Sequence, residues 1–473
     1  MPTQLEYSLT KKRQRREQIK INLLNYKFQI VDEISGVVVG QPRFSNVATN
    51  DIRRTCDITL IPKDSSYNID YGSKIWLDKY VQIYKGIEIS PNSNNYEWTN
   101  MGIYMINNPS QVYDATQNTI TIEGLDLMAK LTGLRNGNLE GIEYSIPQGS
   151  NIRNSIISLI TLAGFSRYSV EEVYVSIDSN IVQTTPYEIK IDVGGNVYDL
   201  LSQLRDIIPN YQMYFDVDGV FNFNKIPSGQ NEQVMVDDDL FKALLIDYKR
   251  DVDYSKVKNS IEVIGKTHDI EYYGNANLSS NVYSITISSV SSIYNNIQIG
   301  FTPNANNNGE IYLKVNSLEE YKIVNEDGTN PTILKDVYYV VKFNSSLNQY
   351  IFLGEVTPSA KVQETNPNSP YYINGTMGVV NIVLNGGEYD NIYSERLALD
   401  RANYELYLNC RLHDSISITC IPIYWLDVNW VIEITLPNKQ GIDIKDKYLI
   451  KEISINDTQT ISLMKYYPLY PSI

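Results

Sequence analysis

Residues 57–62 read DITLIP and residues 417–422 read SITCIP, and the tripeptide WLD follows each of them. The agreement extends to later segments, and the matched pairs are WLDKYVQI at 76–83 with WLDVNWVIEI at 425–434, GIYMINNPS at 102–110 with KYLIKEISI at 447–455, and TITIEGL at 119–125 with TISLMKY at 460–466. Four segments therefore recur in one order. This order predicts a duplicated β unit, against the alternative of two unrelated β domains with similar strand composition.

The first unit is predicted to occupy residues 1–133 and to be a β-barrel, because short segments rich in Ile, Val, Tyr and Thr alternate there with Gly, Asn, Asp and Pro. A basic arm precedes its strands. The arm can grip an acidic neighbour or can be solvated, and its cations are Lys11, Lys12, Arg13, Arg15 and Arg16.

Residues 134–250 are predicted to form a small α+β domain. Apolar residues at helical spacing follow Asn151 and Asn196, which are suitable N-cap residues, and Gly164 and Pro209 end the two patterns. Two alternating runs then meet at Asp218-Gly219, a hairpin signal.

The second barrel is predicted from residues 251–267 together with 390–473, and the low-charge stretch 268–389 is predicted to be an inserted β-rich region. The fold class expected is therefore mainly β with α+β segments, with two similar barrels that flank the α+β domain. A trimer of such a chain would present six similar barrels in a ring.

Composition excludes several classes of function. A net charge of −15 argues against a general nucleic-acid binder, which needs a basic face. The sequence shows neither a signal peptide at its start nor a run of about eighteen apolar residues, so no membrane-spanning segment is expected. The three cysteines, Cys56, Cys410 and Cys420, are too few and too dispersed for a disulfide framework.

Motifs for chemistry are weak, so we predict no catalytic, cofactor-binding or metal-binding residues and no enzyme. GKTH at 265–268 lacks the earlier glycine of a phosphate loop, since Ser260 stands there. Asp216–Gly219 is expected to be a hairpin and not a calcium loop, and Asp237–Asp239 to be a solvated helix cap. His268 and His413 have no metal-ligand spacing.

The ordered set of segments resembles the baseplate-hub or tail-tip hub proteins of tailed bacteriophages, including the N-terminal hub region of tail-associated lysins. The segments that carry the resemblance are GIYMINNPS…TITIEGLDLMAKL, NVYDLLSQL…YFDVDGVFNF, NSIEVIG and GGEYDNIYSERLALDRANYEL…RLHDSISITCIPIYWLDVNWVIEI. They cover most of the chain outside 270–380.

This resemblance implies a structural virion component: a homotrimer that continues the hexameric tail tube, contacts a tail-tube or distal tail ring protein and other tip proteins, and lets DNA pass through its lumen without specific binding. It implies a place at the tail tip, after assembly in the host cytoplasm. Within the barrels, Trp76, Leu77 and Asp78 are expected to be equivalent to Trp425, Leu426 and Asp427.

The alternative function is a carbohydrate-binding tail module that recognises host surface glycans. Tyrosines of the inserted region can offer aromatic platforms to sugars, although tyrosines at alternating strand positions more often pack against their neighbours. These residues are Tyr272, Tyr273, Tyr283, Tyr294, Tyr312, Tyr338, Tyr339, Tyr350, Tyr371 and Tyr372.

Overall fold

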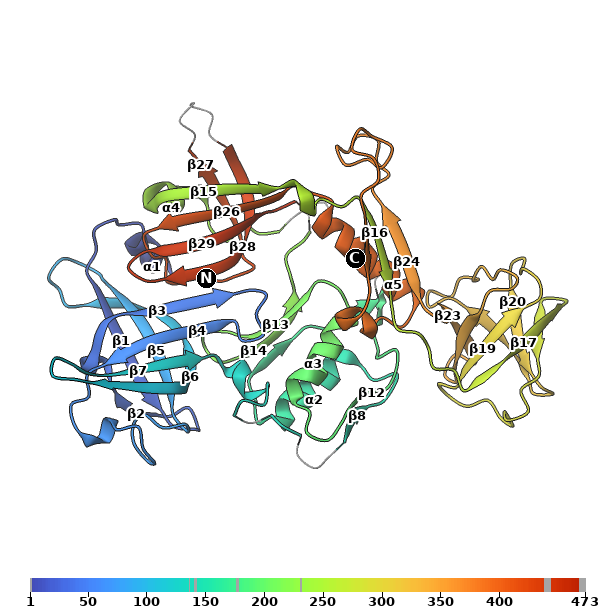
Figure 1. Ribbon diagram of the computed structural model, residues 1–473, viewed down its shortest axis with the longest axis horizontal. Coiled ribbons are helices and arrows are strands. Elements are labelled where there is room, and N and C mark those ends of the chain that lie inside the picture. Colours follow the sequence, from blue (N-terminus) through green and yellow to red (C-terminus); the bar gives the residue numbers. More distant parts are fainter. Residues whose placement is uncertain are drawn as a thin grey trace.

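The computed structural model describes residues 2–135, 137–139, 143–175, 178–229, 232–437 and 444–467. Its architecture is mainly β with a few helices, which confirms the predicted class (Figure 1). A 12-stranded sheet, several small sheets and one closed barrel account for most of the chain. No helix among the described residues is long and apolar enough to cross a membrane.

The first repeat contributes seven strands to the large sheet, in the order β3-β4-β7-β6-β5-β1-β2. Alternating burial in β4, with Cys56, Ile58 and Leu60 inside, places one face on the core. The strands are β1 (Glu17–Leu24), β2 (Ile30–Glu33), β3 (Val38–Val47), β4 (Arg54–Leu60), β5 (Tyr80–Glu88), β6 (Tyr96–Tyr113) and β7 (Asn118–Leu125).

The second repeat follows the same topology. Its strands run β15-β26-β29-β28-β27 and correspond one by one to β3-β4-β7-β6-β5. Their bounds are β15 (Leu245–Asp253), β26 (His413–Cys420), β27 (Val431–Leu436), β28 (Ile444–Ile455) and β29 (Gln459–Lys465). Both copies also carry a ladder irregularity at a similar place, after Asn107 in β6 and after Ile450 in β28. The repeated segments are therefore one β unit used twice.

Strand pairing corrects the alignment of two repeated segments. GIYMINNPS at 102–110 moves by one residue, since Met105 corresponds to Leu449 and not to Ile450, and the last segment moves by two residues. Thr59 pairs with Thr121 in the first repeat and Thr419 with Thr460 in the second. TITI at 119–122 is therefore equivalent to TQTI at 458–461, and not to TISL at 460–463. A shift of two keeps every side chain on its face, so apolar alternation alone cannot detect it.

The middle segment packs two helices against small sheets. Asn151 and Asn196 cap these helices, as their sequences predict. Phe215 and Phe221 pair across the hairpin that turns at Gly219, where φ is 72°. The elements are β8 (Tyr144–Ile146), α2 (Ile152–Leu162), β9 (Tyr168–Val170), β10 (Tyr174–Val175), β11 (Asp178–Val182), β12 (Ile189–Ile191), α3 (Val197–Asp206), β13 (Tyr211–Phe215) and β14 (Phe221–Lys225).

Residues 260–264 and 395–409, which were assigned to the second repeat from the sequence, lie outside it, whereas 251–253 belong to it as the end of β15. β16 (Ser260–Ile264) pairs with β24 (Ser359–Gln363) and β25 (Asn381–Leu384), and not with strands of the second repeat. Helix α5 (Glu395–Asn409) covers this three-stranded sheet. The true first strand of the second repeat is β15, which pairs with β26.

The inserted region contains the closed barrel, which projects on the right of Figure 1. The barrel lies between β16 and β24, so it is an insertion into one hairpin of the α5 unit. Its strands are β17 (Tyr272–Ser279), β18 (Val282–Ile285), β19 (Gln298–Pro303), β20 (Ile311–Val315), β21 (Glu320–Val324), β22 (Tyr339–Asn344) and β23 (Gln349–Glu355).

Candidate assembly interface between the two repeats

The two repeats are joined by one antiparallel strand pair, β28 with β3. The paired residues run from Glu452 opposite Val47 to Ile455 opposite Phe44. The ladder extends at one end, where the Ala48 N–H donates to the Lys451 carbonyl at 2.9 Å. A single hydrophobic core contains buried residues of both repeats. The repeats therefore form one continuous sheet over a shared core.

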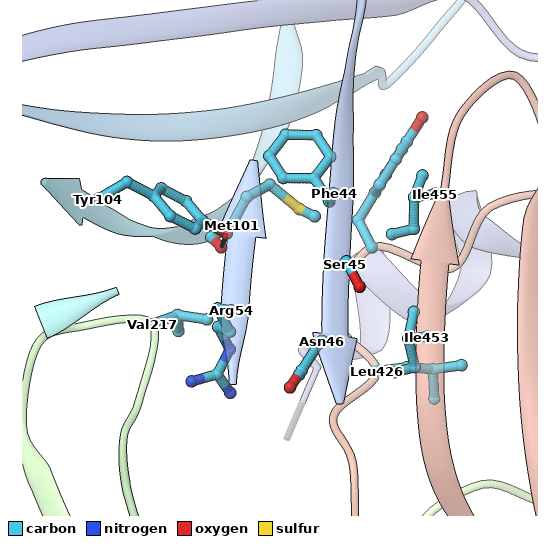
Figure 2. Close-up of a pocket in the computed structure, with 11 residues that line it drawn as sticks. Phe44, Ser45, Asn46, Arg54, Met101, Tyr104, Val217, Leu426, Ile453 and Ile455 are labelled. Atoms are coloured by element: carbon cyan, nitrogen blue, oxygen red, sulfur yellow. Dashed lines mark hydrogen bonds between the residues drawn. The ribbon is translucent and has the colours of Figure 1, made fainter. Parts of the chain in front are cut away.

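A small cavity lies on this junction (Figure 2). Phe44, Met101 and Tyr104 of the first repeat line one part of it, and Ile453 and Leu426 of the second line another. Its volume of about 30 Å³ suits a water molecule and no larger ligand. The junction is therefore a packed interface and not a substrate pocket.

An ion pair crosses the junction beside that cavity. Nη2 of Arg54 lies 2.5 Å from Oδ2 of Asp427, and the Arg54 side chain is only 5% exposed. Asn46 donates from Nδ2 to the other carboxylate oxygen at 2.8 Å. The Arg54 guanidinium also donates to the Phe215 carbonyl of the middle segment. Asp427 is the last residue of the second WLD, so the repeated tripeptide lies in an interface here.

Gln212 of β13 ties the middle segment to both repeats. Its Oε1 accepts from Arg53 Nη1 at 2.8 Å and from Asn429 Nδ2 at 2.7 Å. Burial lowers the pKa of Arg53 to about 10, and burial together with nearby arginines lowers the pKa of Lys451 to about 8. These cations and the carboxylates of Asp126 and Asp427 make the junction a polar network with an apolar surround.

The basic arm is solvated at Lys11, Lys12, Arg13 and Arg16, which are exposed, whereas the Arg15 side chain is buried. Helix α1 (Gln4–Thr10) begins at a Thr3–Glu6 capping box. The side chain of Arg15 is 3% exposed and pairs with Glu17 at 2.6 Å. It also donates to the Pro422 carbonyl, while Trp425 donates from Nε1 to Thr10 at 3.1 Å. The arm therefore fastens the first repeat to the second.

The first WLD has a different environment from the second. Leu77 is 52% exposed whereas Leu426 is 8% exposed. Asp78 pairs with its neighbour Lys79 at 2.7 Å, and its side chain is 42% exposed. The leucine and the aspartate of the WLD tripeptide are therefore more exposed in the first repeat than in the second.

The remaining candidate residues show no cluster typical of chemistry. Asp216–Gly219 forms the β13–β14 turn. Asp238 starts α4 (Asp238–Leu244) but is buried, and Thr435 donates to it through both N and Oγ1 at 2.6 Å, so this part of the cap is not solvated. Within the described ranges, no three His, Cys, Asp or Glu side chains gather closely enough to hold a metal ion.

The two histidines lie apart and in different settings. His268 is buried against the ring of Tyr393, with 3.9 Å between ring centroids, and burial lowers its pKa to about 4. His413 begins β26. Among the tyrosines of the inserted region, Tyr283, Tyr339 and Tyr350 are buried in the barrel core. Tyr273 and Tyr294 are exposed.

Sequence reasoning missed Arg53, Arg54 and Gln212, which carry the polar part of the junction. The available signal was two adjacent arginines directly before an apolar β-strand, a position where charges are usually paired. The partners could not be identified because they come from three distant segments of the chain.

Comparisons with known proteins concern the fold. The family model described as "Domain of unknown function (DUF5048)" matches residues 368–470. No curated protein matches the chain. Among solved structures, the 43 kDa tail protein of prophage MuSo2 from Shewanella oneidensis is similar with a TM-score of 0.50 and 10% identity, over 95% of this chain and 98% of that one.

Two further solved structures cover similar shares of the chain. The tail protein from Neisseria meningitidis MC58 gives a TM-score of 0.48 at 7% identity, over 96% of this chain and 98% of that one. Prophage tail protein gp18 from Listeria monocytogenes EGD-e gives 0.45 at 11% identity, over 94% of each. The first of these three similarities shows that the chain shares its fold with a prophage tail protein.

Proposed function

We propose that the chain is a structural component of a phage tail, namely a trimeric tail or baseplate hub. The observation that carries the proposal is the duplicated β unit, whose two copies are already joined edge to edge within one chain. Three such chains would place six similar units around one axis and match a hexameric tail tube. The fold shared with a prophage tail protein supports the same role.

In this role the chain works by assembly and not by catalysis. Its partners would be two further copies of itself, a tail-tube or distal tail ring protein, and other proteins of the tip. It would reside in the virion at the tail tip, after assembly in the host cytoplasm. The acidic balance of −15 suits a channel through which DNA slides without specific binding, because carboxylates repel phosphates.

The test is the mass of the full chain in solution, measured by light scattering coupled to size exclusion over a wide range of concentrations. A hub predicts a species of three times the 54.1 kDa chain mass, formed either alone or on addition of the neighbouring tail ring protein. A chain that stays monomeric at every concentration and joins no tail component would overturn the proposal.

Glycan binding is the second candidate, and one observation favours it. The barrel of the inserted region projects from the rest of the chain (Figure 1). Its Tyr273 and Tyr294 side chains are exposed. Tyr273 lies beside Tyr338, with 4.7 Å between ring centroids, so a sugar could stack there. Binding of the full chain to a glycan array, lost in Tyr273→Ala, would support this candidate, and an array without signal would remove it.

A further inference from the structure

One junction between repeats forms inside the chain, and no described strand covers the two edges that would form a second one. Inside the chain, the first repeat supplies β3 and the second supplies the outer part of β28. The counterpart of β3 in the second repeat is β15, and the counterpart of β28 in the first is β6. A second junction would therefore join β15 to β6.

Both counterpart edges lack a partner strand among the described residues. β15 pairs with β26 on one side only and ends the path of the large sheet. β5 pairs with β6 only as far as Met105, so residues 108–113 of β6 have β7 on one side and an open edge on the other. Unpaired edges of this kind accept a further strand.

Exposed apolar side chains gather at these edges. Leu77, Val112 and Tyr113 of the first repeat are 52%, 49% and 80% exposed, and Ile246 of β15 is 55% exposed. Leu77 is the counterpart of Leu426, which is buried where the internal junction forms. The exposure of Leu77 is what a missing second junction would produce.

We propose that the open edge of β15 in one copy of the chain pairs with the outer edge of β6 in a second copy, in the antiparallel register that β3 and β28 adopt within each chain. This inference rests on the proposed trimer and names the surface that builds it. Each copy supplies one edge of each kind, so the contact is heterologous, and three copies close a ring.

The equivalences fix the register. Phe44 pairs with Cys56 and Arg250 with Ile416, so Phe44 corresponds to Arg250 and Ser45 to Asp251. Ser454 pairs with Thr460 and Ser110 with Thr121, so Ser454 corresponds to Ser110. Because Ser454 lies opposite Ser45, the register places Ser110 of one copy opposite Asp251 of the next.

The residues next to Ser110 and Asp251 are more polar than those of the internal junction, as suits a surface that water contacts before the copies associate. Gln111 and Arg250 take the places of Ile455 and Phe44, so polar side chains replace buried apolar ones. The counterpart of Arg54 is Asp414, so the second junction would bring Asp414 near the Asp78 of the next copy, and Arg250, which pairs with Asp414 and is 38% exposed, supplies the cation beside these two carboxylates. Pro109 has no N–H, so the free edge of β6 is interrupted, a common protection against unspecific pairing.

The test is disulfide cross-linking of the full chain. Ser110→Cys with Asp251→Cys places two cysteines directly opposite each other in the proposed register, at a separation that a disulfide spans. The matched positive control is Ser45→Cys with Ser454→Cys, the equivalent pair within one chain. The matched negative control is Ser110→Cys with Val252→Cys, because a shift of one residue turns the side chain to the other face.

The natural thiols give little background, because burial raises the pKa of both Cys410 and Cys420 to about 12 and that of Cys56 well above its usual value. After mild oxidation with diamide, a non-reducing gel should show most of the Ser110→Cys/Asp251→Cys protein as a covalent trimer. The positive control should form an intrachain bond and stay at the mass of one chain. The negative control should stay unlinked.

Each result separates the edge pairing from the trimer itself. A trimer by light scattering that forms no cross-link, while the intrachain control does, would overturn the edge pairing and leave the hub proposal standing. A cross-linked ladder beyond three chains would support the edge pairing and overturn ring closure at three. A monomer without cross-links would overturn both.

Discussion

Arg54 of the first repeat and Asp427 of the second form an ion pair across the junction, with 2.5 Å between Nη2 and Oδ2. The same Asp427 accepts from Asn46, so one carboxylate satisfies groups on two strands of the first repeat. Its counterpart in the first repeat, Asp78, pairs with the adjacent Lys79 at the surface. This contrast allows a controlled measurement of what the junction contributes to stability.

Asp427→Asn should destabilise the chain by about 3 kcal/mol, because it leaves the buried guanidinium of Arg54 without its charge partner. Asp78→Asn, the matched change in the first WLD, should cost less than about 1 kcal/mol, since its ion pair is exposed. Urea unfolding followed by fluorescence gives both values. Equal losses in the two variants would mean that the ion pair does not hold the repeats together.

Leu426→Ala should destabilise the isolated chain by about 2–3 kcal/mol, because it enlarges the cavity at the junction. Leu77→Ala should leave that stability within about 0.5 kcal/mol, since Leu77 is exposed. Association should respond differently: Leu77→Ala should raise the concentration at which trimers form. Light scattering of both variants separates the two effects, and an unchanged association midpoint for Leu77→Ala would contradict its place in the contact.

Acidification should destabilise the chain through His268. Burial lowers the pKa of this histidine from 6.5 to about 4, so between these values the unfolded chain binds a proton that the folded chain does not. Stability should therefore fall as pH decreases from about 6.5 towards 4, by an amount on the order of 3 kcal/mol at the lower end. The measurement is the free energy of unfolding at several pH values.

His268→Gln provides the control for that measurement, because it removes the titrating group and keeps His413, whose pKa is also lowered by burial. The difference in pH slope between the two proteins belongs to His268. Identical slopes would show that the folded chain binds the proton as readily as the unfolded one.

Gly124→Ala should destabilise the first repeat by about 1–3 kcal/mol. Gly124 pairs with Cys56 across β7 and β4, and an added Cβ would lie 2.5 Å from the Cys56 sulfur. Cys56→Ala should recover part of the loss when it is added to Gly124→Ala, although alone it destabilises by leaving a small void. A double-mutant cycle of thermal unfolding tests this, and strictly additive losses would contradict the steric explanation.

Part of the fold could be predicted from the order of the segments and from their periodicity alone. The order of the segments predicted the duplicated unit, and the strand topology confirms it. Local patterns predicted the caps at Asn151 and Asn196 and the turn at Gly219, and the cap hydrogen bonds and the hairpin pairing confirm them. The alignment error of two residues arose because alternation repeats every two residues.

Long-range pairing was the part that local patterns could not supply. NSIEVIG looks like any buried strand, and only its partners, β24 and β25, place Ser260–Ile264 outside the second repeat. The interface residues Arg53, Arg54 and Gln212 likewise gain their roles from contacts between segments more than a hundred residues apart. These three residues form no sequence motif that identifies their contact partners.

The two ends of the segment that contains the barrel lie close together, since Ile264 and Ser359 face each other where β16 and β24 pair. A segment with such closely spaced ends can be replaced by another without moving the strands on either side. Its replacement by a short turn, or by another domain whose ends meet, would change the path of no other strand, although α5 would lose its packing against Val340 and Leu353 of the barrel. The large sheet and its open edges could thus stay constant while this module diversifies.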